Sequence, residues 1–170
     1  MRQHWVSEQV FDWAGVGAVH LRAGVFFENL TMLVAIGEWR ELKLPLGSRD
    51  TVIPLVAASD VARVAAGLLG SPDPVDPVCR LTGEVLTVGE IVDAFGVTYV
   101  EVSDEEWRQQ ALAVGYDPHA VEHLSKLWEL FRTIGSGHEL YHVTDSIEKI
   151  GGEPPRTLRD FVQTLTGNLS

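Results

Sequence analysis

The sequence predicts an α/β fold, because short apolar segments alternate with segments of helical periodicity. Residues 18–21 form a mostly apolar run without clean alternation, as expected for a strand buried on both faces of a parallel sheet. Residues 52–57 are rich in β-branched side chains and predict a second strand. We therefore expect strands near 18–21, 52–57, 79–82 and 98–102, followed by helices over 104–134.

The region around the first strand is the candidate ligand site. A helix is expected at Val6–Trp13, where Val6, Val10 and Trp13 recur at helical spacing, and a glycine-rich turn at 14–17 leads into the strand. The strand is followed by Arg22, by the apolar patch 25–27, and by Glu28 and Asn29. Ligands of open parallel sheets bind at the carboxyl ends of the strands, so a ligand site is expected here. The alternative for this stretch is a core strand with a polar edge.

Capping residues mark the helix starts that follow. Thr87 has Glu90 three residues later, which predicts a capping box for a helix that ends at Gly96. Further caps are expected at Ser59 or Asp60, at Ser103, and at Asp117 before Pro118. Pro54 indicates that residues 52–56 form either an edge strand or an extended segment. Residues 71–77, with three prolines, predict a surface loop.

Composition excludes several classes of protein. The chain has 170 residues, the length of one domain, and 24 acidic against 13 basic residues give it a net charge of −11. This balance argues against sequence-independent nucleic-acid binding, which needs clustered Lys and Arg. The single cysteine, Cys79, excludes an intramolecular disulfide, and no apolar run is long enough for a signal peptide or a membrane span. We expect a soluble, cytoplasmic protein.

The order of these segments resembles the NmrA-like atypical short-chain dehydrogenase/reductases. In that family a helix precedes a strand ending in Leu-Arg-Pro, followed by Phe and Glu-Asn. Leu21-Arg22, Phe26 and Glu28-Asn29 match this pattern, and Ala23 replaces the proline. Similar matches are found at residues 52–66, 80–92, 98–102 and 155–165.

The resemblance covers only the C-terminal half of the family's Rossmann-like domain. It implies a partial sheet over residues 1–102 and a helical lobe with a closing helix over 103–170. It also implies NAD(P) as cofactor, with Ala23 and Gly24 as the remnant of the contact with the nicotinamide. The family's glycine-rich phosphate loop joins a strand to a helix, but Gly15–Gly17 follows a helix and Gly135–Gly137 follows a helical run. We expect this chain alone not to bind the cofactor, and either a homodimer or a partner chain that supplies the missing half.

The resemblance also implies a substrate pocket and a candidate acid. We expect one apolar pocket for a small molecule between residues 23–29 and the helical lobe. Its candidate substrate-binding residues are Phe26, Asn29, Trp39, Trp107 and Trp128. Trp107 and Trp128 have the helical spacing of core residues, so packing in the core is the alternative for both; the alternative for Trp39 is packing on the surface. His4 occupies the position of the family's catalytic Lys, and the catalytic Tyr would precede Met1; His4 could instead be an exposed residue on a frayed turn.

Three functions remain open. The first is an NAD(P)H-dependent reductase of a small apolar carbonyl or quinone-like substrate, and the second is a non-catalytic ligand-binding or redox-sensing regulatory protein. The third is a metal hydrolase, because His119, Glu122 and His123 match the H-x-x-E-H pattern, with Glu148 or Glu153 as a further ligand. We assign no metal ligands on this short match.

Overall fold

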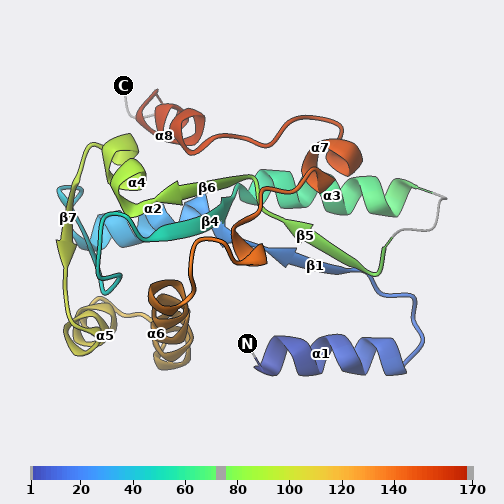
Figure 1. Ribbon diagram of the computed structural model, residues 1–170, viewed down its shortest axis with the longest axis horizontal. Helices are drawn as coiled ribbons and strands as arrows, with labels where there is room; N and C mark the ends of the chain where they lie inside the picture. Colours follow the sequence, from blue (N-terminus) through green and yellow to red (C-terminus); the bar gives the residue numbers. More distant parts are fainter. Residues whose placement is uncertain (1, 72–75, 168–170) are drawn as a thin grey trace.

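The computed structural model describes residues 2–71 and 76–167 as an α/β fold (Figure 1). Strands cross the middle of the molecule, with α7 and α8 on one side and α1, α5 and α6 on the other. The helices are α1 Arg2–Trp13, α2 Phe27–Ile36, α3 Ala58–Gly70, α4 Val88–Phe95, α5 Asp104–Ala113, α6 Pro118–Thr133, α7 Ser146–Gly151 and α8 Leu158–Gly167, with a 3₁₀ turn η1 at Glu139–Tyr141. The strands are β1 His20–Ala23, β2 Val25–Phe26, β3 Glu41–Leu44, β4 Val52–Val56, β5 Val78–Leu81, β6 Glu84–Thr87 and β7 Thr98–Glu101.

The strands pair in three groups. β1 pairs with β5, and β3 pairs with β7, both in parallel. The third group has the order β2-β4-β6, in which β2 and β4 are parallel but β6 runs antiparallel to β4. The sheet is therefore mixed rather than wholly parallel. The pair β1–β5 matters most for the site, because it aligns Arg22 with Arg80 and Ala23 with Leu81.

Several predicted boundaries are wrong for physical reasons. The first strand begins at His20, two residues late, and runs through Ala23. Strand β4 lies in the middle of its group although it contains Pro54. The proline is tolerated because β2 pairs only with Leu55 and Val56, so on that side no ladder bond is lost. Strands β3 and β6 were not predicted, and residues 72–75 of the predicted loop lie outside the described residues.

The local caps are mostly as predicted. Thr87 and Ser103 each form a complete capping box, and the Asp117 side chain accepts hydrogen bonds from the first turn of α6. Gly96 ends α4 in the left-handed conformation. The expected cap of α3 is wrong, since that helix begins at Ala58 and Asp60 lies buried within its first turn.

The core has two parts. The larger part joins α2, β3, β4, α4 and the helical lobe, and the smaller one lies under β5 and α7. Trp107 and Trp128 are fully buried in the larger part, where their rings pack edge to face. Cys79 is buried in the smaller part. In the described part of the chain, no helix is long and apolar enough to cross a membrane.

Candidate functional site

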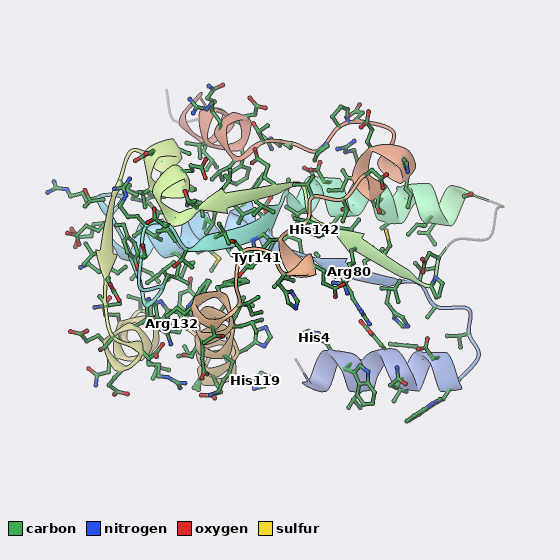
Figure 2. The ribbon with its side chains drawn as sticks, viewed as in Figure 1. His4, Arg80, His119, Arg132, Tyr141 and His142 are labelled. Carbon is green, nitrogen blue, oxygen red and sulfur yellow. The ribbon has the colours of Figure 1, made fainter. Side chains whose placement is uncertain are left out.

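A cavity of about 140 Å³ lies where β1 and β5 end. Ala23 and Gly24 line it from the end of β1, and Arg80 and Thr82 line it from β5 and the residue after it. The opposite wall comes from the segment around η1: Glu139, Leu140, His142 and Thr144. Figure 2 shows Arg80 beside this segment. The cavity is at the carboxyl ends of two parallel strands, where ligands of such sheets bind.

Two arginines lie side by side at this cavity, and each forms an ion pair with a carboxylate from another element. Because Arg22 and Arg80 are register partners in the β1–β5 pair, their side chains leave the sheet side by side. Arg22 donates from Nε and Nη2 to the two carboxylate oxygens of Glu8 on α1, at 3.0 and 2.6 Å. Arg80 donates from Nη2 to Glu139 Oε1 at 2.9 Å. The hydrogen bond from Arg22 lowers the pKa of Glu8 and raises that of Arg22, so both stay charged at neutral pH.

The wall opposite the strands is fixed by a reciprocal backbone link. Thr82 N–H donates to Thr144 Oγ1 at 3.1 Å, and Thr144 N–H donates to the Thr82 carbonyl at 2.9 Å. This link holds residues 142–144 against the end of β5. His142 is therefore held at the cavity by the chain on either side of it, between Thr144 and the η1 turn.

Position 24 requires glycine because of the backbone that packs against it. A Cβ at this position would lie 2.8 Å from the Pro54 carbonyl oxygen of β4, which is too close for any larger residue. Its N–H donates to the Leu81 carbonyl at 2.9 Å, which continues the pairing of β1 with β5. The backbones of β1, β4 and β5 meet at Gly24. Because neither Ala23 nor Gly24 has side-chain atoms beyond Cβ, the cavity stays open beside them.

The structure brings Ala23 and Gly24 to this cavity but not the other predicted residues. Phe26 packs against the smaller core, Asn29 is exposed on α2, and Trp39 is exposed in a turn with φ of 60°. None of these three lines the cavity, and their binding roles stay predictions. Trp107 and Trp128 are buried in the core and do not line this cavity, so their binding roles and the apolar pocket expected beside them also stay predictions. The cavity is also more polar than predicted.

His4 lies in a different place from Ala23 and Gly24. It lines an open groove between α1 and β1, and its ring is 5.6 Å from that of His123 (Figure 2). Partial burial lowers the pKa of His123, and the charges of His4 and His119 lower it further. Both histidines are thus separated from the cavity that holds the candidate cofactor residues.

The H-x-x-E-H pattern does not form a metal site among the described residues. Glu122 is engaged by Arg108, whose Nη1 donates to it at 2.7 Å. Glu148 lies in α7 and Glu153 comes just after it, and α7 is on the side of the molecule away from α6 (Figure 1). Over residues 2–71 and 76–167, no group of three or more His, Cys, Asp or Glu side chains is placed to hold a metal ion.

Sequence reasoning missed most residues of the cavity: Arg22 as a lining residue, Arg80, Thr82, Glu139, Leu140, His142 and Thr144. A signal was present, since Arg22 ends one predicted strand and Arg80 lies in another. Only their register, however, shows that the two arginines are neighbours. Glu139 and His142 belong to an irregular segment whose position no periodicity could predict.

The predicted α/β class is confirmed, because solved structures with a Rossmann-like fold match this chain over about half of their own length. No protein-family model matches the sequence, and no curated protein is significantly similar to it. Solved structures do match. An NADPH-dependent quinone oxidoreductase from Escherichia coli complexed with NADPH has a TM-score of 0.74 and 21% identity, over 94% of this chain and 57% of that chain.

Two further structures agree with this likeness. A nucleoside-diphosphate-sugar epimerase from Staphylococcus aureus has a TM-score of 0.72 and 17% identity, over 93% of this chain and 56% of its own. The triphenylmethane reductase of Citrobacter sp. complexed with NADP(H) has a TM-score of 0.64 and 18% identity, over 84% and 51%. The chain therefore spans about half the length of these structures, and identities this low establish the fold alone.

The cavity fits part of a dinucleotide. Its volume is close to that of a protein cavity that holds one benzene ring, so it can accept a single six-membered ring. A pyrophosphate needs a glycine-rich turn from a strand into a helix. In the described chain the strand-to-helix junctions at Phe26, Ala57, Thr87 and Ser103 have no such turn. The residues thus suit the ring end of a nicotinamide cofactor and not its phosphates.

Proposed function

We propose that this chain is the substrate-side half of an NAD(P)H-dependent reductase that acts on a small apolar carbonyl or quinone-like compound, and that a partner chain completes the cofactor site. The observation that carries the proposal is the one-ring cavity at Ala23 and Gly24, at the ends of two parallel strands. The likeness to a quinone oxidoreductase complexed with NADPH supports it, as does the coverage of about half that chain.

In this proposal each wall of the cavity has a task. A nicotinamide cofactor, when bound, supplies the hydride. The backbone at Ala23 and Gly24 leaves room for a planar ring. Arg80 uses Nη2 to bind Glu139, and its other N–H groups can donate to a substrate oxygen on which negative charge develops. His142 lines the wall opposite Ala23 and Gly24, where a ring N–H can donate a hydrogen bond to a substrate oxygen.

A non-catalytic ligand-binding or redox-sensing role is the second candidate. It is favoured by the position of His4, the acid expected from the sequence, which lies in the α1–β1 groove and not at the cavity. In that case the cavity would bind its ligand without turnover.

Binding experiments with two probes test the proposal. Reduced nicotinamide mononucleotide at millimolar concentration should shift the amide resonances of Ala23, Gly24 and Thr82 in NMR spectra. NADPH should bind no more tightly, because the added phosphate and adenosine find no site on this chain. Ala23→Leu, which fills the cavity, should abolish the shifts, whereas Ala35→Leu on the exposed face of α2 should not.

Three results would contradict the proposal. Micromolar binding of NADPH to this chain alone would remove the need for a partner. Shifts that centre elsewhere, or that survive in Ala23→Leu, would remove the cavity as the site. If binding follows the proposal but a complementing cofactor-binding chain produces no consumption of NADPH with a benzoquinone, the regulatory candidate is favoured over the reductase.

A further inference from the structure

Helix α1 turns most of its apolar side chains away from the rest of the chain. His4, Glu8 and Phe11 face β1 across an open groove of about 420 Å³. At about 100° per residue, Val6, Val10 and Trp13 then lie on the opposite side of the helix. Trp13 is 78% exposed, Trp5 57%, Val10 52% and Val6 49%. An amphipathic helix that belonged only to this fold would present these side chains to the sheet.

The two carboxylates of α1 are already engaged on the side of β1. Glu8 binds Arg22, and Asp12 Oδ1 is 2.8 Å from His20 Nε2. Between residues 4 and 13, the outward face carries Trp5, Val6, Gln9, Val10 and Trp13, without a charge. This uncharged face belongs to a chain with a net charge of −11.

The outward face is large for a surface exposed to water. The exposed parts of the two tryptophans and two valines together present on the order of 500 Å² of apolar surface to water. Soluble monomers rarely leave patches much larger than this uncovered. A weak dimer of two proteins buries about 600 Å² on each partner, so the α1 face and its polar margin suffice for one.

We propose that this chain forms a two-fold symmetric dimer in which α1 packs antiparallel against α1 of a second copy. The face is self-complementary: with the axis between residues 9 and 10, Val6 meets Trp13 of the partner subunit, and Gln9 meets Val10 of the partner subunit. The absence of charge on this face argues for a second copy, because two acidic chains can approach here without placing like charges opposite each other. The inference does not depend on the proposed function.

Sedimentation equilibrium on the intact chain tests the dimer. From about 1 to 200 μM, the mass should rise from 18.7 kDa toward twice that value, with a Kd on the order of micromolar. Trp13→Glu should raise the Kd at least about tenfold by burying charge. Leu69→Glu, at a position that is 91% exposed on α3, is the matched control and should leave the Kd unchanged. Added salt should strengthen association, because it screens the repulsion between acidic copies.

Cross-linking tests the geometry independently of folding stability. Val10→Cys should form a disulfide-linked dimer under mild oxidation, because the two copies of residue 10 lie near the axis. The wild-type chain should not, since Cys79 is buried, and Leu69→Cys should not either. A chain that is monomeric at every concentration, a dimer that Trp13→Glu leaves intact, or a failure of Val10→Cys to cross-link would each overturn the proposal. The first result would assign the face to a different protein.

Discussion

Replacement of Asp60 by Ala should be among the most destabilising single changes in this chain. Asp60 is 1% exposed, and both of its carboxylate oxygens are used. Oδ1 accepts from Arg63 Nη2 at 2.6 Å, and Oδ2 accepts from the Arg156 backbone N–H at 2.8 Å. Arg63 also donates to the carbonyls of Gly151, Glu153 and Pro154, so this carboxylate ties α3 to the segment that leads into α8.

The expected magnitude follows from what the substitution leaves behind. Hydrogen bonds to a charged group contribute about 1.5–3 kcal/mol each, and breaking a buried ion pair by removing one partner costs about 3–5 kcal/mol. Asp60→Ala removes the buried carboxylate of the partly buried Arg63 guanidinium, which keeps only the exposed Glu153 carboxylate at 3.3 Å, and it leaves the Arg156 N–H without this acceptor. We therefore expect a loss of about 3–5 kcal/mol in the free energy of unfolding.

Urea denaturation followed by circular dichroism measures this loss. With a slope of about 2–3 kcal/mol per M, the midpoint should fall by about 1–2 M, with the slope unchanged. Asp60→Asn keeps the shape and should lose less, which gives a measurable value if the Ala variant does not fold. The control is Asp93→Ala, which breaks the exposed pair with Arg49 and should cost less than about 1 kcal/mol. Equal losses for Asp60→Ala and Asp93→Ala would refute the reasoning.

Two further predictions concern a carboxylate and a pair of glycines. Burial raises the pKa of Glu84 in the folded chain above its ordinary value of 4.5. As the pH rises, Glu84 therefore ionises first in the unfolded chain, and the free energy of unfolding falls between the pKa of the unfolded chain and that of the folded chain. Glu84→Gln, which keeps an oxygen to accept from the Leu158 N–H, should raise the urea midpoint at pH 7 and not at pH 4; a gain at both values would contradict this. Gly67→Ala should lower the Tm, with a loss of about 1–3 kcal/mol in the free energy of unfolding, because its Cβ would lie 2.3 Å from the Ile150 carbonyl oxygen of α7. Gly70→Ala, which meets no atom within 4 Å at the end of the same helix, should not lower it.

The sequence by itself determined the class of fold and the local ends of its helices. The capping box of Thr87 and Glu90 joins residues three positions apart, and Gly96 ends the same helix through its own backbone conformation. The cap and first turn of α6, at Asp117 and Pro118, are equally local. Such features depend on neighbours in the chain, so one sequence contains all of the information needed to predict them.

Only the tertiary structure decided which residues form the site. Arg22 and Arg80 become neighbours through the register of β1 on β5, and Glu139 reaches Arg80 from an irregular segment. The apolar spacing of Trp128 in α6 is compatible with a pocket or with a core, and packing against Trp107 placed it in the core. The apolar stripe of α1 was visible in the sequence, but its direction depends on two polar contacts with β1, the ion pair of Glu8 with Arg22 and the hydrogen bond of Asp12 with His20, which turn that stripe toward solvent. These outcomes depend on contacts between distant segments, which helical or strand periodicity does not encode.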